Sequence, residues 1–259
     1  MSRSSPRTPA TPKTQRTGAH PLAEMDAVEV KVTIRPDQEL RAARAMEVDE
    51  DTAEVRVIYF YDTPRLDLFK AGVALRARLV KGDDDDSTVK FRPVKADAIA
   101  EEWRRTEGFK LEADCVGNRV VCSASHTVVQ QRDEIEEVAK GERAIAKLFS
   151  SDQERFLGEF YQGKFDFEEL RVMGPIRVLR WKLKHKGFPY QLTIEEWRLP
   201  NGDDLVEASI KVPPDEAPRA HEEFDQHLKQ LGLDPKGAQE TKTRTALEYF
   251  AKAYREAKS

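Results

Sequence analysis

The segment GVALRARLVKGDDDDSTVKFR, residues 72–92, constrains the fold more than any other part of the chain. Apolar and basic residues alternate on both sides of an acidic run: Leu75, Arg76, Ala77, Arg78 and Leu79, then Val89, Lys90, Phe91 and Arg92. Successive side chains of a strand point to opposite faces, so this period of two predicts a β-hairpin with one apolar and one cationic face. The aspartate run 83–86 is predicted to be its solvated loop.

The same alternation recurs in residues 27–34, 175–187 and 190–212. The polar faces of these strands and of the hairpin collect the following cations: Lys31, Arg76, Arg78, Lys90, Arg92, Arg180, Lys182, Lys184 and Lys211. For any single strand, a solvent-exposed face explains the pattern equally well. However, like charges placed opposite one another destabilise a sheet, so their recurrence favours a bound anion.

Arginine and lysine suit phosphate oxygens, and a polyphosphate neutralises several of them at once. Three carboxylates, Glu29, Glu195 and Glu207, share the cationic faces. Carboxylates repel phosphate but hold Mg²⁺ or Mn²⁺, which bridge to phosphates. The residues therefore predict a closed or strongly curved sheet with a cationic interior that holds a phosphate chain and a divalent metal.

The rest of the chain predicts one α+β domain over residues 25–259, preceded by a disordered tail of residues 1–24 rich in Pro, Thr and basic residues. Residues 54–64 and 100–114 are predicted strands, and residues 36–46, 133–149, 152–161, 215–233 and 240–258 are predicted helices. A net charge of −4 gives no sign of a nucleic-acid-binding surface. No apolar run is long enough to cross a membrane, and no signal peptide is visible, so we expect a cytoplasmic protein.

Five segments together resemble the CYTH, or triphosphate tunnel metalloenzyme, superfamily: VEVKVTI, YFYDTPRLDLFKAGVALRAR, TVKFR, RWKLK and VEASIKV. The resemblance spans roughly residues 25–255. It implies an antiparallel β-barrel of eight strands with flanking helices, a triphosphate inside the tunnel, and Mg²⁺ or Mn²⁺ as cofactor. Members of the superfamily include inorganic and thiamine triphosphatases, RNA triphosphatases and class IV adenylate cyclases.

The resemblance also implies roles for individual residues. It assigns catalysis to Lys31, Arg76 and Arg78, substrate binding to Lys90, Arg92, Arg180 and Lys182, and the metal to Glu29 and Glu207, with Lys242 or Arg244 as a basic residue near the last helix. Strand parity adds Lys184 and Lys211 to the substrate-binding residues and Glu195 to the metal ligands. Ala27 and Ser209 stand where the superfamily has the other glutamate of each acidic pair, and Glu195 or Glu112 could substitute for the missing carboxylates.

Three functions remain open on this basis. The first is metal-dependent hydrolysis of an inorganic or organic triphosphate. The second is a catalytically weak or inactive module that binds polyphosphate or nucleotide, which the missing carboxylates favour. The third is a cyclase reaction. The oligomeric state, the substrate and the pathway stay open.

Overall fold

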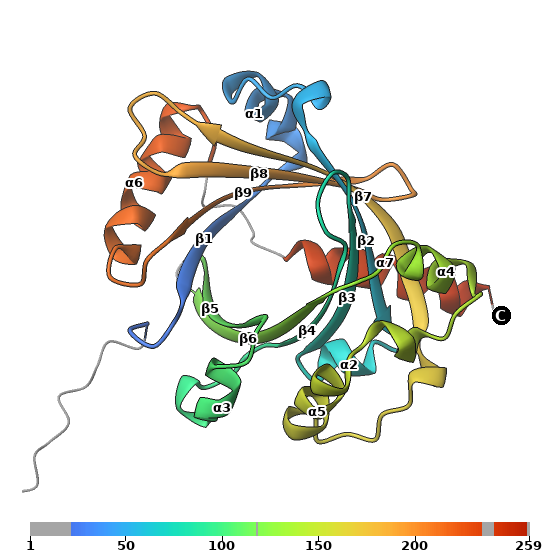
Figure 1. Cartoon of the computed structure of the whole chain (residues 1–259). Helices are drawn as coiled ribbons and strands as arrows, with labels where there is room; N and C mark the ends of the chain where they lie inside the picture. Colours follow the sequence, from blue (N-terminus) through green and yellow to red (C-terminus); the bar gives the residue numbers. More distant parts are fainter. Residues whose placement is uncertain (1–21, 118, 235–240, 258–259) are drawn as a thin grey trace, which may run out of the picture.

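The structure is a computed structural model that describes residues 22–117, 119–234 and 241–257, leaving out the side chains of residues 40 and 41. Nine strands form a closed barrel in the order β1-β5-β6-β4-β3-β2-β7-β8-β9 (Figure 1). The strands are β1 Ala27–Ile34, β2 Glu54–Asp62, β3 Val73–Val80, β4 Asp86–Phe91, β5 Phe109–Val116, β6 Arg119–Val129, β7 Arg171–Lys184, β8 Gln191–Arg198 and β9 Asp204–Val212. The helices are α1 Glu39–Ala45, α2 Asp67–Lys70, α3 Glu101–Arg104, α4 Glu134–Lys140, α5 Ser151–Phe160, α6 Ala217–Gln230 and α7 Lys242–Glu256.

The predicted β-barrel with flanking helices is confirmed, with two refinements. The barrel has nine strands where the resemblance implies eight, and the pair β1–β5 is parallel while the other pairs are antiparallel. The two refinements have one geometric cause. Strand directions cannot alternate all the way around a closed ring with an odd number of strands, so at least one neighbouring pair must be parallel.

Cross-strand register separates the apolar from the charged side chains as the alternation predicts. In the hairpin of β3 and β4, Leu75 lies opposite Val89, and Arg76 lies opposite Thr88. The apolar set belongs to a core that includes Phe156 of α5 and Phe224 of α6, and Figure 1 shows these helices on the outside of the barrel. The charged set therefore lines the inside.

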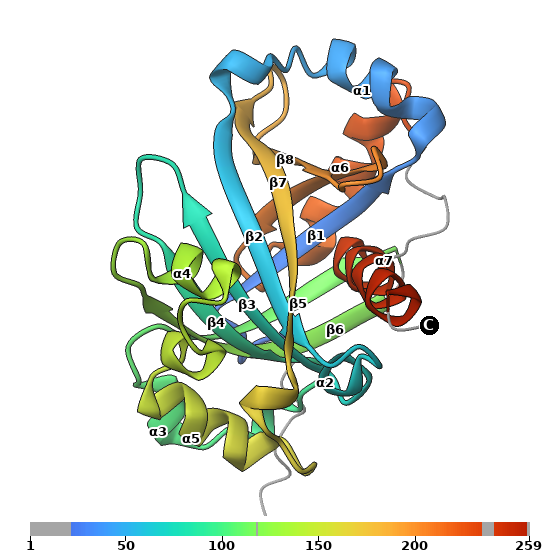
Figure 2. The same ribbon diagram turned by 90° about the vertical axis from the view of Figure 1, so that its right-hand side faces the viewer.

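Helix α7 lies across one end of the barrel (Figures 1 and 2). Its Leu247 and Phe250 pack in a second apolar cluster with Ile58, Phe60 and Ile176. Ile58 and Phe60 are in register with Arg78 and Arg76, so this cluster sits on the charged, inner face. One end of the interior is thus apolar and filled by α7, and the remaining inner face is ionic.

Three local expectations differ from the structure. Residues 100–114 were predicted to be one strand, but they form α3 followed by β5, and Trp103 of α3 is fully buried. The predicted helix 133–149 ends after Lys140, because Gly141 adopts φ 79°, a left-handed conformation that terminates helices. Asp86 was assigned to a solvated loop, but it begins β4 and is buried.

Most of the predicted disordered tail, residues 1–21, falls outside the described residues; residues 22–24 form a turn. No helix in the part of the chain that the structure describes is long and apolar enough to cross a membrane.

Candidate functional site

One ionic cluster in the barrel is centred on Asp114 of β5. Its carboxylate lies 2.9 Å from Nζ of Lys31, 3.0 Å from Nη2 of Arg92 and 3.8 Å from Nζ of Lys90, and only 3% of its side chain is exposed. Lys31 also lies 3.0 Å from Glu29. The cluster therefore draws cations from β1 and from the end of β4 to one buried carboxylate.

Burial and charge act in opposite directions on this cluster. Burial disfavours the charged form of Asp114, but the neighbouring cations, Lys31 foremost, hold its pKa well below the ordinary value. Burial likewise opposes the charge of Lys31, yet Glu29 and Asp114 raise its pKa well above the usual range. Burial lowers the pKa of Lys90, whose single ion pair is long. Asp114 and Lys31 are therefore both charged at neutral pH.

A second group of cations comes from β3. Arg78 makes a two-pronged contact with Asp86, with its Nε 3.0 Å from Oδ2. Arg76 differs, because it makes no ion pair with any residue that the structure describes. Its Nη2 donates a hydrogen bond of 3.3 Å to Thr88, and its buried Nε has no hydrogen-bond partner in the described part of the chain.

The surroundings of Arg76 make it an incomplete site. Burial and the neighbouring guanidinium of Arg78 lower the pKa of Arg76 to about 10. The residue is therefore still protonated at neutral pH, and Asp86 and Glu195 favour its charge without forming an ion pair with it. A half-buried cation without an ion-pair partner among the described residues is costly, so the position favours a bound anion.

The third group lies on β7, β8, β9 and α7. Glu195 and Glu207 are directly opposite in the register of β8 and β9. Nζ of Lys242 lies 2.6 Å from Glu195 and 3.1 Å from Glu207. Arg180 approaches Glu195 at 3.4 Å from the other side and also contacts Glu54. Lys242 was one of two residues predicted as the basic position near the last helix, and its ammonium lies among the barrel carboxylates.

The remaining predicted cations lie outside these contacts. Lys182 and Lys184 of β7 are exposed, and no ion pair joins either of them to another described residue. Lys211 pairs with Glu112 and is 51% exposed. The inner face is thus lined by six half-buried cations, whereas these three lysines are the more exposed members of the set. The six are Lys31, Arg76, Arg78, Lys90, Arg92 and Arg180.

The residues predicted to hold a divalent metal are engaged by lysines. Glu29 contacts Lys31, while Glu195 and Glu207 share the ammonium of Lys242. Across residues 22–117, 119–234 and 241–257, no group of three or more His, Cys, Asp or Glu side chains is placed to hold a metal ion. A metal needs several free oxygen ligands at one point. As arranged, these glutamates do not fit a metal centre.

Several important side chains were not predicted from the sequence. Asp114 lies two residues after Glu112 on β5, so strand alternation places both on the charged face. The alternation does not indicate that Asp114 contacts three cations. Arg56 and Glu54 of β2 pair with each other on the inner face. Their alternation in EVRVIYFY was the signal that could have identified them.

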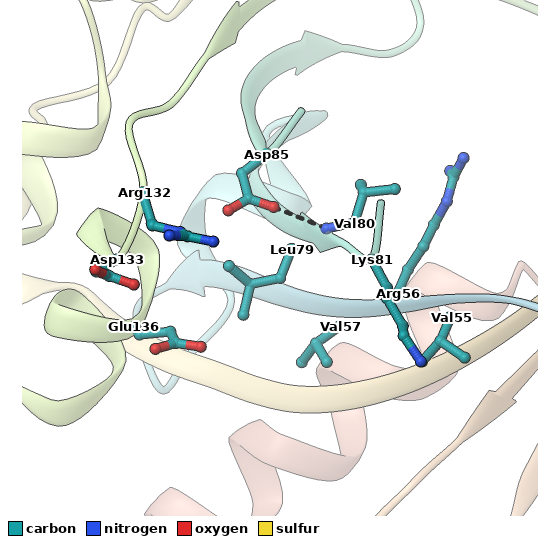
Figure 3. A pocket seen from close by; sticks show the side chains of 10 residues that line it. All are labelled: Val55, Arg56, Val57, Leu79, Val80, Lys81, Asp85, Arg132, Asp133 and Glu136. Atoms are coloured by element: carbon teal, nitrogen blue, oxygen red, sulfur yellow. Dashed lines mark hydrogen bonds between the residues drawn. The ribbon is translucent and has the colours of Figure 1, made fainter. Parts of the chain in front are cut away.

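A cavity of about 250 Å³ lies beside the barrel, and Arg56 is the one residue of the ionic contacts described above that lines it (Figure 3). Val57 and Leu79, which are opposite each other on β2 and β3, form its floor, and Arg132 and Glu136 at α4 approach from the other side. Val57 alternates with the inward-facing Arg56, so this cavity belongs to the outer face. It contains none of the predicted site residues.

Comparisons with known proteins bear on the fold. No protein-family model matches the sequence, and no curated protein sequence matches it. Two solved structures are similar: a candidate adenylate cyclase from Bacillus halodurans, with 13% identity and a TM-score of 0.57, and HpAC1 from Hippeastrum, with 18% identity and a TM-score of 0.56. The first match covers 84% of this chain and 96% of the other, and the second covers 82% and 91%.

HpAC1 is described as a candidate adenylyl cyclase with a dominant triphosphatase activity. At such identities the likeness concerns the fold, and it extends over most of both chains. Together with the closed barrel and its charged inner face, it confirms that the chain has the CYTH-type tunnel fold.

Proposed function

We propose that the barrel binds the triphosphate group of a small molecule, or inorganic tripolyphosphate, and hydrolyses a phosphoanhydride bond. The single observation that carries this proposal is Arg76, a protonated side chain on the inner face without an ion-pair partner among the described residues. Arg78 of β3 and Lys90 of the neighbouring strand β4 lie on the same face of the sheet as Arg76. A phosphate chain supplies the negative charge that this part of the interior lacks.

The inner-face cations also suit the chemistry of phosphoryl transfer. The transition state is loose and spreads charge over the phosphate oxygens, so catalysis depends mainly on positioning and on fixed positive charge. Arg76 and Arg78 would bind and orient the phosphates, and Lys90 and Arg92 would offset charge on the same chain. A divalent ion, where required, would arrive as part of the substrate complex.

A second candidate is a binding module without catalysis. The contacts of Glu29, Glu195 and Glu207 with lysines favour it, because those carboxylates are not free to hold a metal or to accept a proton from water. Triphosphate binding is common to both candidates, and turnover separates them.

The test is a screen of phosphate release from tripolyphosphate, ATP and thiamine triphosphate, with Mg²⁺, Mn²⁺ or EDTA, and with chromatography to detect cyclic AMP. Binding is measured in parallel by calorimetry. The Arg76→Met/Arg78→Met double variant is the inactive comparison, and Arg105→Met, on an exposed side chain, is the matched control. Turnover that the double variant loses supports the hydrolase, and binding without turnover supports the module. A wild-type protein that binds none of these compounds refutes both.

A further inference from the structure

Lys242 occupies an unusual position for a lysine. It is the first residue of α7, its side chain is only 6% exposed, and its ammonium lies between two carboxylates of adjacent strands. Thr241 caps the helix by accepting a hydrogen bond from the backbone N–H of Arg244, which fixes where the helix begins. The position of Lys242 is therefore set by the backbone as well as by its charge.

The two carboxylates need a cation. Glu195 and Glu207 are directly opposite each other, and like charges in that arrangement destabilise a sheet. The ammonium neutralises part of this repulsion. It also lies 4.9 Å from the centre of the Trp197 ring, whose Nε1 donates to Glu195. The indole and the two carboxylates thus surround one positive charge.

A divalent ion at this point of the barrel would require the same two carboxylates. Lys242 contacts both at hydrogen-bonding distance, so a metal can use them only by displacing the ammonium into a buried setting without a partner. That displacement is costly for a buried charge. The lysine therefore competes with a metal for the same ligands.

We propose that Lys242 is a built-in cation that replaces a protein-bound divalent metal in the barrel, so that phosphate binding does not require a metal held by Glu195 and Glu207. The part of this inference that concerns phosphate rests on the proposed function; the part that concerns the metal does not. A direct consequence is that removing Lys242 converts the two glutamates into a site for Mn²⁺.

The experiment titrates Mn²⁺ into the full-length protein without phosphate, using electron paramagnetic resonance to count bound ions and thermal melts to follow stability. The variants are Lys242→Met, Lys242→Met/Glu207→Gln, and the control Lys252→Met, which changes a 71% exposed lysine on the same helix. We expect Lys242→Met to gain one bound Mn²⁺ with affinity at least about tenfold above wild type, because hard cations follow ligand charge. Its melting temperature should rise with Mn²⁺, while the double variant and the control should behave like wild type.

A second arm measures tripolyphosphate binding in EDTA. Wild type should bind, and Lys242→Met should bind about tenfold or more weakly, because Glu207 then loses its ion-pair partner and Glu195 keeps only the longer contact with Arg180, so both carboxylates repel the ligand more strongly. Mn²⁺ should restore the affinity of Lys242→Met.

The outcomes separate the two proposals. Wild-type protein that binds Mn²⁺ without phosphate and loses it on Glu207→Gln overturns the role of Lys242. So does wild-type protein that binds tripolyphosphate only when Mn²⁺ is present. If no condition gives tripolyphosphate binding, the proposed function fails, while the Mn²⁺ titration still decides the role of Lys242. If Lys242→Met does not fold alone, recovery of folding by Mn²⁺ supports the inference, and no recovery together with Mn²⁺ binding by wild type overturns it.

Discussion

Replacing Arg76 with methionine should weaken tripolyphosphate binding strongly while changing the stability of the free protein little. A hydrogen bond between a charged donor and a charged ligand contributes about 1.5–3 kcal/mol. At about 1.4 kcal/mol for each tenfold change, the dissociation constant should rise by about 10- to 150-fold. In the free protein, Arg76 makes a single hydrogen bond, of 3.3 Å, to the residues that the structure describes, and it lies beside the like charge of Arg78. The free energy of unfolding should therefore change by less than about 1 kcal/mol.

Calorimetry at fixed ionic strength gives the affinity, and denaturant unfolding without ligand gives the stability. Arg105→Met serves as the control, because its side chain is 77% exposed and it directly follows α3, which lies outside the barrel. Arg76→Lys should recover part of the affinity, since it keeps the charge but not the planar fork. An Arg76→Met protein that binds tripolyphosphate within about twofold of wild type would refute the reasoning. So would one that unfolds, because that result would give Arg76 a structural role.

Three further outcomes are expected. The pKa of Asp114 is depressed in the folded protein, so its ionised carboxylate stabilises the fold above the unfolded pKa of about 4, and this stabilisation is lost as the pH falls. Asp114→Asn should lower the free energy of unfolding by about 3 kcal/mol at pH 7, and it should make that free energy depend less on pH between pH 7 and pH 3. Lys182→Ala and Lys184→Ala should change tripolyphosphate affinity by less than about threefold at physiological salt, because exposed charges are screened, and a larger loss would place these lysines in the site. Gln153 of α5 is fully buried, and its amide nitrogen donates 3.0 Å hydrogen bonds to the backbone oxygens of Ser87 and His126. Gln153→Ala should therefore lower the free energy of unfolding by about 2 kcal/mol or more, and an unchanged denaturation midpoint would contradict this account.

Strand parity explains why so much of the inner face was predictable. A period of two assigns every residue of a strand to one of two faces, and Arg76 and Arg78 of β3 follow it directly. Parity gives neither depth along the barrel nor distance around it. It therefore put Lys182 and Arg180 together, although one is exposed and the other contacts Glu195 inside.

The partners of the charges could not be predicted in the same way. Asp86 looked like part of an acidic loop, because four consecutive aspartates outweigh the strand pattern that begins at the last of them. Lys242 belongs to an amphipathic helix whose sequence resembles any surface helix, and the contact with Glu195 joins residues 47 positions apart. Trp103 was predicted to be part of a strand because it is apolar, but it is the buried residue of the short helix α3.

The neutral residues at positions 27 and 209 fit this distribution of charge. Ser209 lies in register with Lys31, and Ala27 lies in register with Glu112, which already has Lys211 as its partner. A glutamate at position 27 would face Glu112 directly and add repulsion. The carboxylates that the inner face retains each contact a lysine or arginine. Among the half-buried cations predicted for the site, Arg76 is the one without an ion pair to any described residue, whereas Lys182 and Lys184 are exposed. Further acids would cancel that excess positive charge. Neutral residues at positions 27 and 209 therefore keep the interior suited to binding an anion and not a metal cation.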